Sequence, residues 1–132
     1  MARVLIVEDD QSVLELLSRS VSWLGHEIET ATDSENAMNL LQRLESVDIV
    51  IADFWLNGIS VISFLDQVIK EMPSAGIIVI SGGAKDTSFE MTKALVQSCG
   101  PIEFLQKPFR KFEIWDAINR VARDQCNHCV PI

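Results

Sequence analysis

Acids, a hydroxyl and an amine follow four separate apolar runs of this 132-residue chain. Glu8-Asp9-Asp10 and Asp53 supply the acids, and Ser81 and Lys107 supply the hydroxyl and the amine. Clustered carboxylates repel one another, and a hard divalent cation such as Mg²⁺ relieves that repulsion. Because Mg²⁺ uses only one or two carboxylates and keeps several waters, Asp53 would remain available as a nucleophile. Lys107 and Ser81 would then neutralise phosphoryl oxygens, with Gly82 letting backbone N–H groups approach. This set predicts an acyl phosphate at Asp53.

These residues can act together only if the fold gathers them. Short β-branched runs alternate with segments of helical period, which predicts five strands and five helices. The strands are expected at residues 4–7, 27–30, 48–52, 76–80 and 102–105. The helices are expected from the cap Asp10 to Gly25, from Asp33 or Ser34, from about Ser60 to Glu71, within residues 87–98, and after Pro108.

Strict alternation of strands and helices predicts an α/β fold, a three-layer αβα sandwich around a parallel sheet. In such open sheets the ligand site lies beyond the carboxyl ends of the strands, where the polar clusters stand. The sequence contains no repeat or linker, so we expect one domain over residues 1–125 and a tail over residues 126–132. Trp23 and Trp115 lie in helical patterns and are expected to pack at the edge of the core.

The amino-acid composition excludes several classes of function. Hydrophobic residues make up 48% of the chain and charged residues 23%, as in globular proteins. The net charge of −8 argues against direct nucleic-acid binding. No apolar run approaches the roughly 20 residues that a membrane span needs, and the first residues do not resemble a signal peptide. We therefore expect a cytoplasmic protein with reduced thiols. Cys126-Asn127-His128-Cys129 offers too few ligands for a structural zinc site and is expected to be tail.

Four signatures together resemble the receiver domain of two-component response regulators. They are Val4-Leu5-Ile6-Val7-Glu8-Asp9-Asp10, Asp48-Ile49-Val50-Ile51-Ala52-Asp53, Ile78-Val79-Ile80-Ser81-Gly82 and Phe104-Leu105-Gln106-Lys107-Pro108-Phe109. The resemblance extends from Val4 to about Asp124. It implies a flavodoxin-like (βα)5 fold with the strands in the order 2-1-3-4-5. Each signature is weak alone, but four in order at the ends of the right strands are specific.

The resemblance implies a metal site and a phosphoacceptor. Glu8, Asp9 and Asp53 would bind Mg²⁺, with the backbone carbonyl of Trp55 as a further ligand. Asp53 would take the phosphoryl group from a phosphohistidine of a sensor histidine kinase or a phosphotransfer protein. The domain would catalyse its own phosphorylation and dephosphorylation as a signalling module and not as an enzyme.

The resemblance also implies a switch. Ser81 would move to hydrogen-bond the phosphoryl oxygen, Lys107 would form an ion pair with it, and Phe104 would repack inward. The fourth helix, fifth strand and fifth helix would then present an altered surface to a downstream effector or to a second copy of the chain. No contact with a membrane is expected.

Three departures from the usual pattern of the family stand out. Asn57 occupies a position where proline is common, so the turn after the acceptor lacks that rigidity. Phe104 has no phenolic hydroxyl, so its switching would depend on packing alone. Trp55 is bulky beside the expected path of the attacking water, which predicts slow hydrolysis of the phosphoryl group.

Three other functions fit the sequence less well. A phosphatase of the haloacid-dehalogenase type would resemble Asp-x-Asp-x-Thr, which Asp53-Phe54-Trp55-Leu56-Asn57 lacks. A flavodoxin-like nucleotide or flavin binder would need a glycine-rich loop after the first strand, where Glu8-Asp9-Asp10 would repel phosphate. A receiver-like module that only binds proteins, and is never phosphorylated, is disfavoured because the acidic pair, acceptor, hydroxyl and lysine are all present.

Overall fold

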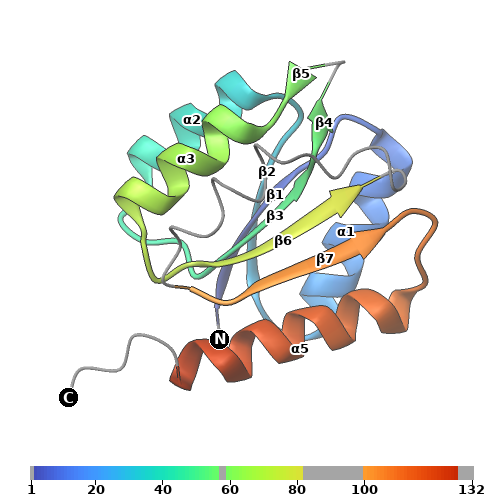
Figure 1. The fold of residues 1–132 in the computed structure, drawn as a ribbon. Helices are drawn as coiled ribbons and strands as arrows, with labels where there is room; N and C mark the ends of the chain where they lie inside the picture. The colour runs from blue at the N-terminus through green and yellow to red at the C-terminus, as the bar shows by residue number, and fades with distance from the viewer. Residues whose placement is uncertain (1, 57–58, 82–99, 128–132) are drawn as a thin grey trace.

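The computed structural model describes residues 2–56, 59–81 and 100–127 (Figure 1). The expected fourth helix, within residues 87–98, and Gly82 lie outside these ranges. The elements are β1 (Arg3–Val7), α1 (Gln11–Trp23), β2 (Glu27–Ala31), α2 (Ser34–Arg43), β3 (Ile49–Asp53), β4 (Trp55–Leu56), β5 (Ile59–Ser60), α3 (Ile62–Glu71), β6 (Gly76–Ser81), β7 (Ile102–Gln106) and α5 (Lys111–Asn127).

The central sheet has five parallel strands in the order β2-β1-β3-β6-β7. Counted over these five strands alone, this is the expected order 2-1-3-4-5. Strands β4 and β5 lie outside this sheet and form a separate antiparallel hairpin, which was not predicted from the sequence. Helices α2 and α3 cover one face of the sheet, and α1 and α5 cover the other (Figure 1). The flavodoxin-like three-layer α/β sandwich is therefore confirmed.

Successive residues of the buried strands enter two different cores, because side chains alternate across a sheet. Leu5 and Val7 of β1 pack in the core beneath α2 and α3, whereas Val4 and Ile6 pack in the core beneath α1 and α5. All four side chains are fully buried. Strands that are apolar on both faces therefore fix β1 in the middle of the molecule and its carboxyl end at the edge where the polar residues stand.

Local signals set the helix boundaries. The Asp10 carboxylate accepts hydrogen bonds from the backbone N–H groups of Ser12 (2.9 Å) and Val13 (3.3 Å), and Asp33 caps α2 in the same way. The expected start of the third helix at about Ser60 is wrong. Ser60 belongs to β5, and its hydroxyl accepts a hydrogen bond from the N–H of Ile62, where α3 begins.

Two further expectations concern α1 and α5. Helix α5 continues to Asn127, two residues into the segment expected to be a tail, while the division of the chain at residue 125 stays a prediction. Trp115 packs against the core beneath α1 and α5 as expected, but Trp23 is 79% exposed, so its expected packing is wrong. In the described ranges, no helix combines the length and the apolar character that crossing a membrane requires.

Gly100 lies where two backbone segments approach closely before β7. A Cβ atom at this position would overlap the backbone carbonyl of Ala75, which cannot move aside as a flexible side chain would. We expect Gly100→Ala to lower the free energy of unfolding by about 1–3 kcal/mol. Urea unfolding measures this change. Gly25→Asn is the control, because Gly25 has φ +88 in open space and asparagine tolerates that conformation. If Gly100→Ala and Gly25→Asn lost equal free energy of unfolding, the close approach of the backbone to Gly100 would not be the cause of the destabilisation.

Candidate functional site

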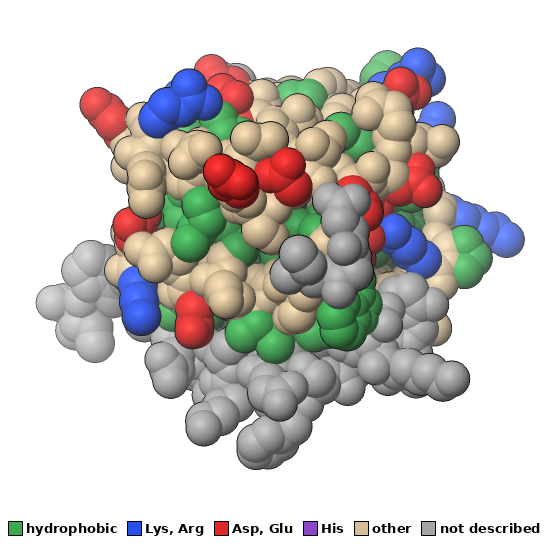
Figure 2. Space-filling view, turned by 90° about the horizontal axis from the view of Figure 1, so that it is seen from above, with side chains coloured by type: hydrophobic (Ala, Val, Ile, Leu, Met, Phe, Trp, Pro, Cys, Tyr) green, Lys and Arg blue, Asp and Glu red, His purple; other side chains and the backbone are tan. Residues whose placement is uncertain are grey.

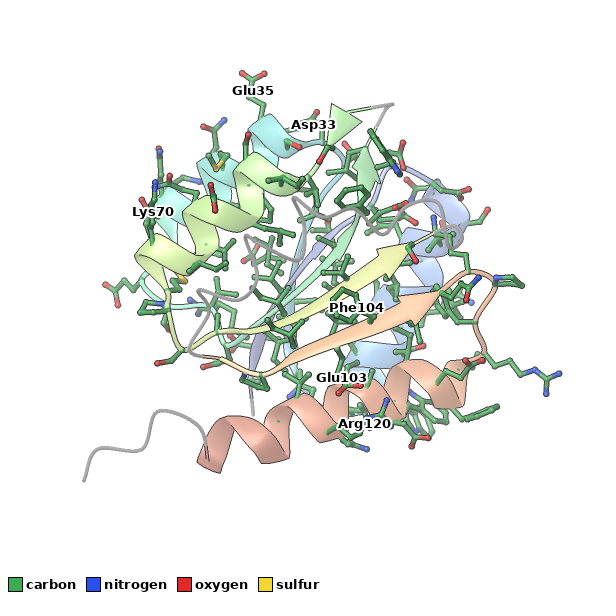
Figure 3. The ribbon with its side chains drawn as sticks, in the orientation of Figure 1. Asp33, Glu35, Lys70, Glu103, Phe104 and Arg120 are labelled. Atoms are coloured by element: carbon green, nitrogen blue, oxygen red, sulfur yellow. The ribbon has the colours of Figure 1, made fainter. Side chains whose placement is uncertain are left out.

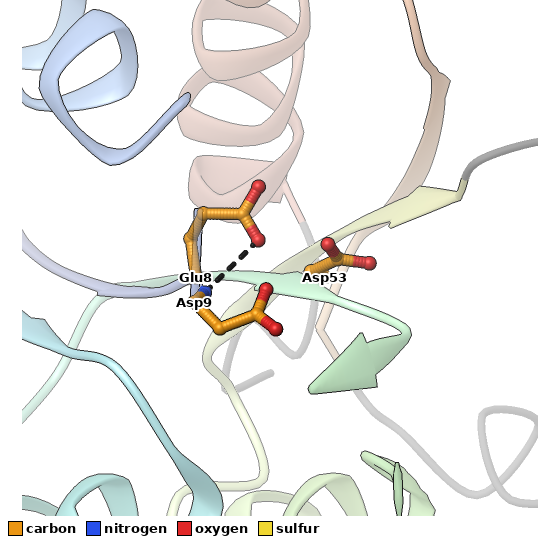
Figure 4. Close-up of side chains that lie close together, drawn as sticks. All are labelled: Glu8, Asp9 and Asp53. Carbon is orange, nitrogen blue, oxygen red and sulfur yellow. Dashed lines mark hydrogen bonds between the residues drawn. The ribbon is translucent and has the colours of Figure 1, made fainter. Parts of the chain in front are cut away.

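Three carboxylates converge at the carboxyl ends of β1 and β3 (Figure 4). Val7 pairs with Ala52 in register, so the residues that follow them, Glu8 and Asp53, lie next to each other. One carboxylate oxygen from each of Glu8, Asp9 and Asp53 lies within 4.8 Å of the others. Glu8 is fully buried, Asp53 is 6% exposed and Asp9 faces solvent. The sequence therefore placed all three acids of the predicted metal site correctly beside one another.

Lys107 reaches this cluster from the far side of β6. Its Nζ atom lies 2.8 Å from Oδ2 of Asp53, to which it donates a hydrogen bond, and 2.8 Å from Oε1 of Glu8. The N–H of Lys107 donates to the carbonyl of Ser81 (2.8 Å), which fixes the backbone after β7 against the end of β6. One ammonium group therefore joins the ends of β1 and β3 to the segment that follows β7.

Burial and charge shift the protonation equilibria of this cluster. Desolvation by burial, together with the neighbouring Asp53, raises the pKa of Glu8 to about 8, although Lys107 acts in the opposite direction. Burial alone would lower the pKa of Lys107, but its contacts with Asp53 and Glu8 raise it to about 12. Oε1 of Glu8 has its ion pair with Lys107 but no hydrogen bond among the described residues. The cluster thus carries more negative charge than one lysine satisfies.

The hairpin of β4 and β5 begins directly after Asp53. The N–H of Trp55 donates to Oδ1 of Asp53 (3.2 Å), so the Asp53 carboxylate is held by this N–H and by Lys107. The Trp55 ring, 42% exposed, meets the buried Phe54 ring edge-on at 5.1 Å. Phe54 accepts a backbone hydrogen bond from Val61 (2.9 Å), and hydrogen-bonded pairs alternate in antiparallel ladders. The next pair, Trp55 with Ser60, is therefore one without hydrogen bonds, and the carbonyl of Trp55 lies outside the ladder.

The two remaining predicted residues lie near the site without joining the cluster. Ser81 ends β6, directly after the register partner of Asp53, but within the described ranges its hydroxyl makes no hydrogen bond to Glu8, Asp53 or Lys107. Phe104 lies on β7 and is 55% exposed (Figure 3). Glu103, which precedes Phe104 on β7, forms an ion pair with Arg120 of α5 at 3.0 Å. The predicted switch roles of Ser81 and Phe104 stay predictions.

Sequence reasoning missed the hairpin and the pairing of Glu8 with Lys107. The hairpin had a signal, because Asn57-Gly58, which stands between Trp55-Leu56 and Ile59-Ser60, is typical of a two-residue hairpin connection. The ion pair of Glu8 with Lys107 had no signal in the sequence, because it depends on how far the Lys107 side chain reaches across β6. The structure also confirms that Asp10 caps α1, the role predicted for it in place of a metal ligand.

Comparison with known proteins agrees with this geometry. Residues 4–119 match the response regulator receiver domain family. The chain is 30% identical to the transcriptional regulatory protein YrkP of Bacillus subtilis, over 85% of this chain and 46% of that protein. It is also 30% identical to the response regulator FleR of Pseudomonas aeruginosa, over 94% of this chain and 25% of FleR. The chain thus spans less than half the length of these curated relatives.

Solved structures show the same fold. A CheY-like receiver domain protein from Methanospirillum hungatei matches with a TM-score of 0.82 and 20% identity, over 96% of this chain and 98% of that one. The receiver domain of NtrX from Brucella abortus matches with a TM-score of 0.76 and 25% identity, over 91% and 98% of the two chains. With the acidic cluster, the lysine and the sheet order in place, the chain belongs to the response regulator receiver domain family, the phospho-accepting modules of two-component signalling.

Proposed function

We propose that Asp53 is the phosphoacceptor of this receiver and that Mg²⁺ binds beside it. The observation that supports this most strongly is the position of the Asp53 carboxylate, between the acidic pair and Lys107 at the carboxyl edge of the sheet. Such an edge is where open α/β sheets bind their ligands. A carboxylate that is nearly buried, oriented by two donors and close to a cation site meets the needs of a nucleophile in phosphoryl transfer.

The donor set fits Mg²⁺. Carboxylate oxygens from Glu8, Asp9 and Asp53 are close enough to share one ion, and hard oxygen ligands suit it. The carbonyl of Trp55 lies outside the β4–β5 ladder and would supply a further oxygen. When bound, the ion would neutralise charge on the acids and on the transferring phosphoryl group. Asp9, which faces solvent, would be the more direct protein ligand of the acidic pair.

In the transfer, three side chains of this chain would act on the phosphoryl group, with Mg²⁺ bound beside them. A carboxylate oxygen of Asp53 attacks the phosphorus of a phosphohistidine, the P–N bond breaks, and the imidazole leaves with a proton from solvent. Lys107 then pairs with a phosphoryl oxygen, and the Ser81 hydroxyl moves to hydrogen-bond it. Hydrolysis reverses the modification when water attacks phosphorus and the P–O bond to Asp53 breaks.

The signal enters and leaves through other proteins. We infer that a cytoplasmic sensor histidine kinase or phosphotransfer protein supplies the phosphoryl group. A downstream effector, or a second copy of the chain, would read the face formed by β7, α5 and the expected fourth helix. Phe104 would change its packing on that face, where it is now exposed. Charge added at Asp53 would thereby bias the packing of a distant surface.

A direct test uses a small phosphodonor. Incubation with acetyl phosphate and Mg²⁺ should add one phosphoryl group, seen in the intact mass and removed by hydroxylamine, which cleaves acyl phosphates. A modification stable to hydroxylamine would place the phosphate on a hydroxyl and would refute the proposed chemistry.

Trp55 should determine how long the phosphoryl group persists. The exposed ring follows the acceptor by two residues and packs edge-on against Phe54, so it would hinder the approach of water. We expect Trp55→Asn to speed dephosphorylation by about tenfold, equivalent to about 1.4 kcal/mol in the barrier. The rate is followed by intact mass after removal of the donor. Trp23→Asn, an exposed tryptophan on α1, is the control, and an unchanged rate in Trp55→Asn would end this hypothesis.

A further inference from the structure

A groove of about 610 Å³ runs between α1 and α5, on the face of the sheet opposite α2 and α3. It is distinct from the acidic cluster, with which it shares no residue. Two indole rings, two cationic side chains and two serines line it. They are Trp23, Trp115, Arg19, Lys111, Ser20 and Ser22.

Trp115 forms a fixed wall of this groove. Its indole N–H donates a hydrogen bond to the backbone carbonyl of Ser20 (3.1 Å). This carbonyl lies in the last turn of α1, where Leu24 bonds instead to the carbonyl of Val21, so the tryptophan satisfies an acceptor at the helix end. The contact ties α5 to α1 and orients the indole. Opposite it, the Trp23 side chain is 79% exposed, the largest exposed fraction among the large hydrophobic side chains of the described ranges.

The charge of the groove is opposite to that of the chain. The protein carries a net charge of −8, yet none of the described residues that line the groove is an acid. In the ranges that the structure describes, neither Arg19 nor Lys111 takes part in an ion pair, whereas Arg3, Lys107 and Arg120 do. Elsewhere acidic and basic side chains are interspersed, as on the face drawn in Figure 2. Unpaired cations beside one exposed and one partly buried indole favour an anionic ligand with apolar groups.

We propose that this groove binds an acidic amphipathic helix of a partner protein. A helix laid between two packed helices would bury apolar side chains against Trp23 and Trp115 and place carboxylates beside Arg19 and Lys111. A second copy of the chain fits poorly. A symmetric dimer through this face would bring the same cations of both copies together, and that repulsion is costly. The inference goes beyond phosphorylation at Asp53 and does not depend on it.

The test uses three synthetic peptides of about 18 residues, long enough to form a helix. All carry leucines along one helical face, and the other faces carry glutamate, glutamine or lysine. Calorimetric titration of the full chain should show saturable binding of the glutamate peptide only. Arg19→Glu combined with Lys111→Glu should weaken that binding by about tenfold or more, and Trp23→Ala should weaken it by about tenfold. These three side chains are solvent-facing or line the open groove, so the variants should fold, which circular dichroism checks.

Matched controls separate this site from other surfaces. Lys70→Glu reverses an exposed charge on α3, across the sheet from the groove (Figure 3), and should leave binding unchanged, as should Asp53→Asn. Several outcomes would overturn the inference. Absence of saturable binding, or equal binding of the glutamine peptide, would contradict the choice of an acidic helix, and so would equal binding of the glutamate peptide by the charge-reversed variant. Displacement of the peptide by indole-3-acetate at a similar concentration would assign the groove to a small anion. A concentration-dependent dimer that Trp23→Ala abolishes would assign it to a second copy of the chain.

Discussion

Asp53→Asn should abolish the hydroxylamine-labile phosphoryl adduct completely. The amide that replaces the carboxylate is a poor nucleophile, and Glu8, which is held in a similar way by the N–H of Asp9 and by Lys107, is fully buried. The N–H of Trp55 fixes one oxygen of this carboxylate and Lys107 fixes the other. The measurement is the intact mass after incubation with acetyl phosphate and Mg²⁺. The fold should survive, because the change removes one negative charge from a group of three carboxylates, two of which pair with Lys107.

Two controls sharpen this result. Asp66→Asn changes an exposed aspartate on α3 and should be phosphorylated as the parent is. Chelation of Mg²⁺ in the parent should prevent the adduct, since the acids would then repel the incoming phosphoryl group. An adduct that persists in Asp53→Asn would assign the acceptor to another residue and refute the proposed site.

Mg²⁺ affinity should fall steeply as the pH drops below about 8. Burial raises the pKa of Glu8 to about 8, so below that value the carboxyl group holds a proton that must leave before it can bind a cation. Well below that pKa the apparent affinity should weaken by about tenfold per pH unit, which gives about fiftyfold between about pH 8 and about pH 6. Lys107 adds no titration in this window, because its pKa is about 12. Calorimetry at several pH values, with the heat of proton release separated by buffer choice, measures the effect.

The same shift has an opposite consequence for the metal-free protein. Because the pKa of Glu8 in the folded state lies above its ordinary value of 4.5, the folded state holds the proton more tightly than the unfolded state. The stabilisation from this group is complete below about pH 4.5 and is lost as the pH rises through about 8. Glu8→Gln should flatten the pH dependence both of metal affinity and of unfolding. A parent whose metal affinity is constant between about pH 6 and about pH 8 would contradict the raised pKa.

The sequence predicted the fold well because its signals were local and repeated. The apolar runs that became β1, β3 and β6 are buried on both faces, and only a central position in a parallel sheet satisfies both faces at once. The site followed from the fold. Once the strands are parallel, Glu8 and Asp53 must emerge at one edge, so their proximity required no knowledge of side-chain geometry.

Prediction from the sequence failed at positions where tertiary contacts determine the structure. Trp23 has the helical spacing of a core residue, but its position at the end of α1 directs it away from the sheet, where it is 79% exposed. The predicted start of α3 was wrong because Ser60 pairs with Trp55 in the hairpin and does not begin the helix. The role of Lys107 as a partner of both Glu8 and Asp53 depends on side-chain reach, which spacing along the chain does not encode.

The bridge from Lys107 to Asp53 spans 54 positions of the chain and passes over β6, which lies between β3 and the strand that Lys107 follows. These charges meet only after β1, β3, β6 and β7 have aligned, so most of the loop-closure entropy is lost before the bridge forms. We therefore expect the functional edge to assemble late in folding and not to nucleate it. Evolution can accordingly alter these charges for signalling with little effect on how fast the chain reaches its native state.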